Sequence, residues 1–199
     1  MTDKPKYYDV RGEFWRAIWD RSDDYTTYLQ NSPPDKAARW HEMAPKIPPL
    51  GDEQRKRLHG YNRALNVLLY TGVWCGDCVR QGPMIRQITE AADDKVTLRC
   101  IDRDADPKLT DELRILGATR VPVVVFLSED FFEVGRFGDR LLTVYRRKAA
   151  TEIGAACPVP YAIPPHGELT AERDEWVDLF ERMLLMTRLS PPLRQRHGD

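Results

Sequence analysis

The stretch from Leu65 to Pro83, LNVLLYTGVWCGDCVRQGP, constrains the fold of this chain more than any other. Its first half is a short apolar run that ends at a glycine, which is typical of a strand buried on both faces of a parallel sheet. Its second half begins with two cysteines, Cys75 and Cys78, and continues with apolar residues at helical spacing. The stretch therefore predicts a strand that passes directly into a helix, with a C-x-x-C pair at the junction.

A C-x-x-C pair at the start of a helix has a physical reason to be redox-active. Cys75 would lie near unpaired backbone N–H groups and the positive end of the helix dipole, which stabilise a thiolate. The spacing of two residues lets the second sulfur reach the first and close a disulfide. Zinc binding is one alternative, but Cys100 and Cys157 are not at a common ligand spacing and the four histidines show no metal pattern. A redox-silent pair is the other alternative.

Four more residues around these cysteines match the spacing of a known family. They are a tryptophan directly before the motif, two prolines and a glycine: Trp74, Pro83, Pro122 and Gly138. With these residues at these spacings, the chain resembles the thioredoxin family. That family has a W-C-x-x-C motif and a proline in the active-site helix. It also has a cis-proline that faces the disulfide and a glycine on the surface that contacts substrates. The resemblance covers about residues 65–148. The W-C-G-D-C form of the motif and the long N-terminal helical region indicate a bacterial thioredoxin-like branch, not thioredoxin itself.

The resemblance implies roles for the residues of the motif. Cys75 is expected to be the nucleophile and Cys78 the resolving thiol, with Gly76 and Asp77 as supporting residues between them. A substrate disulfide would be attacked by the Cys75 thiolate, and Cys78 would then resolve the mixed disulfide. Trp74 is expected to shield the site and contact substrates, with plain packing as the alternative.

A second segment is expected to face the cysteines. Val121 and Pro122 would present backbone groups to an extended substrate, and Arg120 and Gly138 are further candidates for substrate contact. Arg120 either supplies positive charge near the thiols or is simply solvated. Asp77 either disfavours the thiolates through its charge, partly offset by Arg80, or is a helix-start carboxylate without a catalytic role.

The chain departs from the family at Leu69. Thioredoxins carry a buried aspartate six residues before the first cysteine, where it accepts the proton of the resolving thiol. Leu69 leaves open whether Asp77 or a water serves Cys78 in its place. The other two cysteines have different expected roles: Cys100 is expected to be structural, whereas Cys157, in a proline-rich connector, is expected to be accessible to oxidation.

The pattern outside the motif predicts an α/β protein of thioredoxin-like fold, with a central mixed four-stranded sheet and helices on both faces. The strands are expected at residues 66–71, 96–101, 121–127 and 131–137, and Asp139 is expected to cap the following helix. Three parts are predicted: an N-terminal helical extension packed on the core (1–60), a thioredoxin-like domain (61–152), and a C-terminal connector and helix (153–199). The aromatic residues of the first part are expected in the core, with a partner-binding surface as the alternative.

Composition and charge exclude several functions. The 30 basic and 31 acidic residues give a net charge of −1, so no overall field attracts nucleic acid or an anionic membrane. No apolar run approaches the length of a membrane span, and the first ten residues lack the core of a signal peptide. Four cysteines, one close pair and two distant singles, fit a reducing compartment better than a disulfide scaffold.

These observations predict a cytoplasmic thiol–disulfide oxidoreductase that reduces protein or small-molecule disulfides through Cys75 and Cys78. It would need no bound cofactor or metal. Its expected partners are disulfide-containing protein substrates and an upstream thiol reductant or thioredoxin-type reductase. The alternative is a thioredoxin-fold module that binds a partner or senses redox state, without efficient reductase activity.

Overall fold

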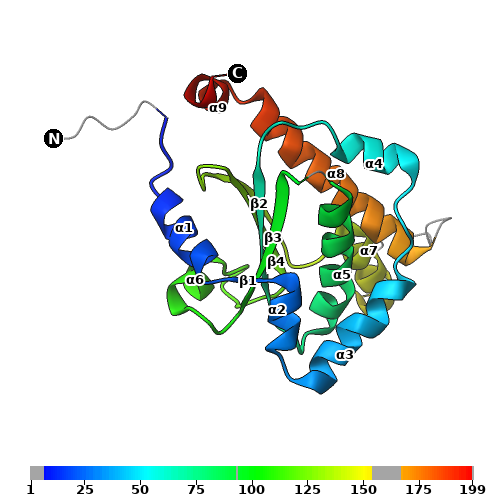
Figure 1. Ribbon diagram of the computed structural model, residues 1–199. Coiled ribbons are helices and arrows are strands. Elements are labelled where there is room, and N and C mark those ends of the chain that lie inside the picture. The colour runs from blue at the N-terminus through cyan, green and yellow to red at the C-terminus, as the bar shows by residue number, and fades with distance from the viewer. Residues whose placement is uncertain (1–6, 93, 154–166, 199) are drawn as a thin grey trace.

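A computed structural model describes residues 7–92, 94–153 and 167–198 of the chain. The elements of these residues are shown in Figure 1. The helices are α1 (Gly12–Asp20), α2 (Tyr25–Gln30), α3 (Pro34–Met43), α4 (Asp52–Leu58), α5 (Gly76–Ala91), α6 (Pro107–Glu112), α7 (Leu142–Lys148), α8 (Glu168–Leu189) and α9 (Pro191–His197), with a short 3-10 turn η1 (Ala44–Lys46) and a π-turn η2 (Ala149–Ile153). The strands are β1 (Asp23–Asp24), β2 (Leu65–Thr71), β3 (Val96–Asp102), β4 (Val123–Ser128) and β5 (Glu133–Gly138).

The strands form one mixed sheet in the order β1-β3-β2-β4-β5. β2 and β3 are parallel, and the other neighbouring strands are antiparallel. The predicted α/β class, with a mixed sheet and helices on both faces, is therefore confirmed. The sheet has one strand more than the four predicted, because Asp23 and Asp24 pair with Cys100 and Arg99 of β3. Two aspartates show no apolar alternation, so their backbone pairing leaves no pattern in the sequence.

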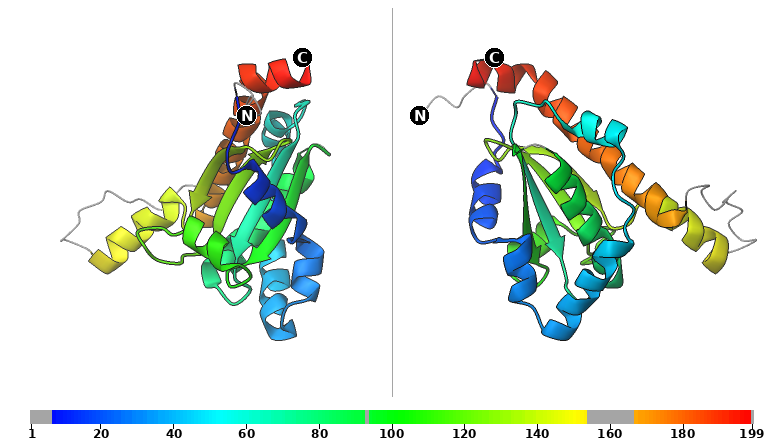
Figure 2. Two further views of the ribbon diagram at one scale, coloured as in Figure 1. Left: turned by 90° about the vertical axis from the view of Figure 1, so that its left-hand side faces the viewer. Right: turned by 45° about the vertical axis from the view of Figure 1, so that its right-hand side comes forward.

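Different helices cover the two faces of the sheet, as Figures 1 and 2 show. On one face, Phe126 of β4 meets Phe180 of α8 with ring centroids 5.1 Å apart. On the other face, Arg136 of β5 lies 5.6 Å from the ring of Trp15 of α1. These two directions follow from the alternation of side chains along a strand. α5 lies beside α8 on the first face, and α6 lies beside α1 on the second.

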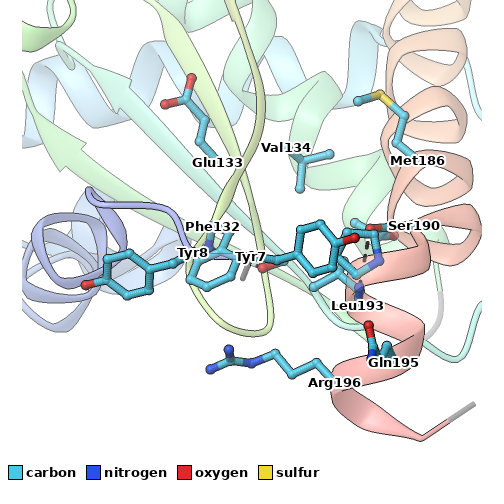
Figure 3. A pocket seen from close by; sticks show the side chains of 13 residues that line it. Tyr7, Tyr8, Phe132, Glu133, Val134, Met186, Ser190, Leu193, Gln195 and Arg196 are labelled. Atoms are coloured by element: carbon cyan, nitrogen blue, oxygen red, sulfur yellow. Dashed lines mark hydrogen bonds between the residues drawn. The ribbon is translucent and has the colours of Figure 1, made fainter. Parts of the chain in front are cut away.

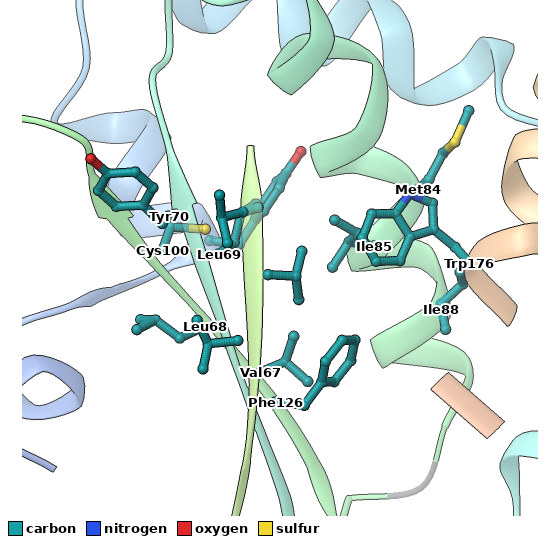
Figure 4. Packing of buried hydrophobic residues seen from close by; sticks show 14 of the residues in the cluster. Val67, Leu68, Leu69, Tyr70, Met84, Ile85, Ile88, Cys100, Phe126 and Trp176 are labelled. Carbon is teal, nitrogen blue, oxygen red and sulfur yellow. The ribbon is translucent and has the colours of Figure 1, made fainter. Parts of the chain in front are cut away.

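The core is centred on β2 and β4, the two middle strands of the sheet. Leu68, Leu69 and Phe126 are fully buried, and Figure 4 shows them between the sheet and its helices. A strand covered on both faces has no solvent side, which explains why both strands read as unbroken apolar runs. Trp15 and Trp40 of the N-terminal helices are also completely buried, so these aromatic residues belong to the core as expected.

The first and last parts of the chain pack on the same core as the middle. The N-terminal helices contribute Trp15 and Trp40, and α8 contributes Trp176 and Phe180, all of them buried. The boundaries at residues 60 and 152 stay a prediction. Within the described residues, no helix is both long enough and apolar enough to cross a lipid bilayer.

Candidate active site

The two cysteines lie at the junction of β2 and α5, as the sequence predicts. Cys75 is the N-cap of α5, and its sulfur accepts a hydrogen bond from the backbone N–H of Cys78 at 3.4 Å. The N-cap position brings the sulfur to the unpaired N–H groups of the first helical turn. In the thiol form, Cys75 Sγ also donates to the carbonyl oxygen of Val121 at 3.6 Å.

This position makes Cys75 acidic for a thiol. A hydrogen bond from the Cys78 thiol is the largest cause, and it lowers the pKa of Cys75 to about 6 against the opposing effect of burial. Backbone N–H groups of Cys78 and Asp77 lower the pKa further, whereas the negative charge of Asp77 raises it. Each favourable contact stabilises the thiolate and not the thiol. Cys75 is therefore largely a thiolate at neutral pH, and it is partly exposed.

Cys78 has the opposite character. Its side chain is completely buried, and this burial is the main reason that its pKa is raised far above the usual value. The hydrogen bond to Cys75 and the charge of the Cys75 thiolate raise the pKa further. A half-exposed thiolate beside a buried thiol is the arrangement that an attacking and a resolving cysteine require.

Thr71 is a residue of the site that the sequence analysis missed. It is the last residue of β2 and lies on the same face of the strand as Leu69, two residues earlier. Both side chains are completely buried. The Thr71 hydroxyl makes no well-aligned hydrogen bond, yet it is close enough to the Cys78 sulfur to lower the pKa of that thiol. The only sequence signal was a hydroxyl at the end of an apolar run.

The segment before β4 packs against the cysteines and against Gly138. The Val121–Pro122 peptide bond is cis, as the family resemblance implies. Gly138 pairs with Val123 across the β4–β5 ladder. A Cβ atom on Gly138 would come within 2.8 Å of the Pro122 carbonyl oxygen and 2.9 Å of Val123 Cγ2. Gly138 therefore lets β5 approach the proline segment more closely than a side chain would allow.

Several charged residues have partners other than those expected. Arg120 is not simply solvated, because its Nη1 donates to Asp139 at 3.1 Å. Asp139 does not cap α7: the N-cap is Leu141, and Asp139 is a buried acceptor that also bonds Tyr145.

Arg80 does not contact Asp77 as an ion pair either. It forms a two-pronged pair with the buried Glu172 of α8, with both nitrogen–oxygen distances at 2.7 Å. The partner of Asp77 is Arg140, whose Nη2 lies 2.7 Å from Asp77 Oδ2. These pairs join segments distant in sequence, so local spacing gave no indication of them.

Trp74 stands at the surface beside Cys75 and is 44% exposed. The guanidinium of Arg103 lies 4.7 Å from the centre of its ring, and Arg39 donates to its backbone oxygen at 3.2 Å. The Arg103 contact holds the indole, and the Arg39 contact holds the backbone, while much of the ring stays in solvent. Trp74 is therefore accessible to a substrate, unlike Trp40, which is fully buried and donates to Val73 O at 2.9 Å.

No second chemical centre is found in the described residues. Cys100 is buried, and burial raises its pKa, so it is not a reactive thiol. Cys157 lies outside the described residues. Within the described ranges, no three His, Cys, Asp or Glu side chains are grouped in a way that could hold a metal ion.

A cavity of about 660 Å³ lies away from the cysteines, at the opposite end of β4 from Pro122. Figure 3 shows its lining, which includes Tyr7, Tyr8, Phe132 and Leu193. It shares no residue with the site of Cys75 and Cys78. The cavity is therefore separate from the dithiol site.

A strand that ends at a helix-capping dithiol, with a cis-proline segment against it, defines a thioredoxin-fold protein with a C-x-x-C site. The chain belongs to the thioredoxin family: a family model described as thioredoxin matches residues 23–146. No curated protein matches the chain.

Two solved structures show the same fold. One is a protein of unknown function from Pseudomonas aeruginosa, with a TM-score of 0.63 and 17% identity, over 84% of this chain and 95% of the other. The second is a scaffold that carries an HIV epitope, with a TM-score of 0.58 and 18% identity, over 92% of this chain and 98% of the other. At these identities the likeness extends to the fold alone.

Proposed function

We propose that the protein is a thiol–disulfide oxidoreductase that reduces disulfides with the dithiol of Cys75 and Cys78. The observation that carries this proposal is the contrast between the two thiols. Cys75 is a half-exposed helix cap with a pKa of about 6, and Cys78 is a buried thiol that bonds to it. Such a contrast separates the attacking sulfur from the resolving sulfur.

The proposed reaction has two exchanges. The Cys75 thiolate attacks one sulfur of a substrate disulfide, which forms a Cys75–substrate disulfide and releases the other substrate sulfur as a thiolate. Cys78 then loses its proton and attacks the Cys75 sulfur, which closes the Cys75–Cys78 disulfide and releases the second substrate thiolate. The substrate gains two electrons and the protein dithiol loses them. An external thiol or dithiol reductant must restore the protein for the next turnover.

The surroundings support a protein disulfide as substrate. The backbone of Val121 is beside Cys75, and the exposed Trp74 flanks it, so an extended chain would bind against the Val121 backbone and the Trp74 ring. Four cysteines, one close pair and two distant singles, suit the reducing environment of the cytoplasm. No cofactor is needed, since the electrons are carried by the two sulfurs.

Two serine variants test the proposed roles. Cys75→Ser should abolish the protein's acceleration of insulin reduction by dithiothreitol, because the attacking thiolate is gone. Cys78→Ser should still attack and accumulate mixed disulfides on Cys75, visible by mass spectrometry. Adducts on Cys78 in the first variant and none on Cys75 in the second would reverse the assignment. A wild-type protein that forms the Cys75–Cys78 disulfide but fails to accelerate insulin reduction would favour a redox-sensing module.

A further inference from the structure

A group of charged and phenolic side chains connects the dithiol helix to the turn between β5 and α7. Its members are Asp77, Arg120, Asp139, Arg140 and Tyr145. Asp139 is 3% exposed. Its carboxylate oxygens accept hydrogen bonds from the Tyr145 hydroxyl, from Arg120 at 3.1 Å and from Arg140 at 3.3 Å. These bonds lower the pKa of Asp139, although burial opposes them, so Asp139 is a structural anion and a poor proton acceptor.

Arg140 is the member that reaches the active-site helix. Its Nη2 lies 2.7 Å from Asp77 Oδ2, while its Nη1 lies 3.3 Å from Asp139 Oδ2. The side chains of Arg140 and Asp77 are only 22% and 29% exposed, so solvent screens this pair less than an ordinary surface pair. One guanidinium thus fastens the first turn of α5 to the turn that follows β5.

Asp77 matters because it lies between the two cysteines. Its negative charge works against the Cys75 thiolate, whereas its backbone N–H favours that thiolate. A cation beside the Asp77 carboxylate would weaken the effect of its charge on the Cys75 thiolate. Arg80 faces Asp77 from the same helix, but it is bonded to Glu172 and Glu168 of α8. Among the described residues, Arg140 is the cation in contact with the Asp77 carboxylate.

Building on the proposed function, we propose that Arg140 is a positioning residue of the dithiol: its guanidinium neutralises the Asp77 carboxylate and fixes the start of α5, where Cys75 caps the helix. Arg140 touches neither sulfur and transfers no proton. Its positive charge opposes the field of the Asp77 carboxylate at the Cys75 sulfur, and its contact with that carboxylate fixes the first helical turn, whose N–H groups face the sulfur.

The experiment measures the ionisation of Cys75 without any substrate. The full-length reduced protein is alkylated with iodoacetamide from pH 4.5 to pH 9, and the rate at the Cys75 peptide is followed by mass spectrometry. Arg140→Gln should raise the apparent pKa of Cys75 by roughly 0.5–1 pH unit, since the Asp77 charge is then unopposed. Arg140→Lys should restore most of the wild-type value. Arg146→Gln, a loss of the same charge from an exposed site on α7, should change nothing.

Variants of Asp77, the partner of Arg140, give a sharper test of the proposal. Asp77→Asn should lower the pKa of Cys75, and the double variant Asp77→Asn with Arg140→Gln should return it to within about 0.3 pH unit of wild type. A folded Arg140→Gln protein with an unchanged pKa would overturn the proposal. If Arg140→Gln alone does not fold, the double variant decides. A Cys75 pKa in the double variant that differs from the wild-type value by more than about half a pH unit then overturns the proposal. Because alkylation needs no turnover, these results stand apart from any failure of insulin reduction.

Discussion

Cys75 and Cys78 are chemically similar thiols three residues apart, and their surroundings separate them. The helix cap leaves Cys75 partly exposed and gives its thiolate several donors, while Cys78 lies in the apolar layer beneath. A Cys75 pKa of about 6 is closer to the value of thioredoxin, about 7, than to that of the periplasmic oxidant, about 3.5. A thiolate stabilised to this extent suits a donor of electrons more than a strong oxidant.

The ionisation of Cys75 should make the stability of the reduced protein depend on pH. Its pKa falls from 9.0 to about 6 on folding, so its contribution is present above the unfolded pKa and is lost as pH falls through 6. Relative to Cys75→Ser, the free energy of unfolding should rise from pH 6 to pH 8.5, by on the order of 1–2 kcal/mol after allowance for solvent screening. Urea titrations of both reduced proteins measure this difference. If the difference in the free energy of unfolding between the two proteins stays flat or falls as pH rises, the lowered pKa of Cys75 is contradicted.

Above about pH 9 the free energy of unfolding of the reduced wild-type protein should fall. Burial keeps Cys78 protonated in the folded protein, whereas the unfolded chain loses that proton near the usual thiol pKa. A raised folded pKa contributes stability only below the unfolded pKa, so this contribution is lost at alkaline pH. The pH range below 8.5 therefore isolates Cys75.

Thr71 should assist the resolving step in the absence of a buried acid at Leu69. Its hydroxyl lowers the pKa of Cys78, so Thr71→Val should raise that pKa and slow the decay of a preformed Cys75 mixed disulfide, by roughly 3- to 10-fold. Thr71→Ser keeps the hydroxyl and should restore the rate. Stopped-flow fluorescence of the three proteins gives the rates. Equal rates for valine and threonine would show that the hydroxyl has no part in the release of Cys78's proton.

At the scale of elements, α3 and α5 approach each other closely through Gly82 and Trp40. A Cβ atom on Gly82 would lie 2.0 Å from Trp40 Cζ3 and 2.7 Å from Trp40 Cη2. Trp40 is fully buried, so its ring has no room to move away. The glycine therefore lets the N-terminal helices cover the active-site helix, although glycine costs helical stability elsewhere.

Two glycine substitutions in α5 should have different effects on stability. Gly82→Ala should destabilise the protein by roughly 1–3 kcal/mol, because the new methyl group overpacks against Trp40. Gly76→Ala, in the first turn of the same helix, meets no atom within 4 Å and should be neutral or stabilising by up to about 1 kcal/mol. Thermal or urea unfolding of both variants measures the contrast. A stabilising Gly82→Ala would show that the two helices are not in tight contact.

The sequence predicts the elements well where a pattern is local and poorly where a contact is distant. β2, β3 and β4 appear as apolar or alternating runs, and the N-cap position of Cys75 follows from a strand meeting a helix. The pairing of Arg140 with Asp77 joins residues 63 positions apart, so no local pattern predicts it. Helical spacing places Arg80 near Asp77, where it offsets part of that charge, but its direct hydrogen bonds go to the buried Glu172 of α8.

At the scale of the whole molecule, α8 completes the layer that α5 begins. Its inward residues Trp176, Phe180 and Leu184 are at most 1% exposed. Trp176 packs on Phe137 of β5 at 5.3 Å, and Phe180 packs on Phe126 of β4. The family match ends at residue 146, before this helix begins. The part of the chain that carries the family pattern is thus covered by a helix from outside that part.

This dependence predicts that a chain ending at residue 153 is unstable. It would contain the whole family match and both cysteines, but Phe126 and Phe137 would lose their cover and expose apolar surface. Near-ultraviolet circular dichroism and urea unfolding should show no fixed aromatic packing and no cooperative transition. Two point variants refine the test in the full chain. Phe180→Ala should cost about 3–5 kcal/mol. Leu185→Ala, at a position on the same helix that is 41% exposed, should cost less than about 1 kcal/mol. A truncated chain that unfolds cooperatively, together with equal costs at positions 180 and 185, would show that the sheet holds its core without α8.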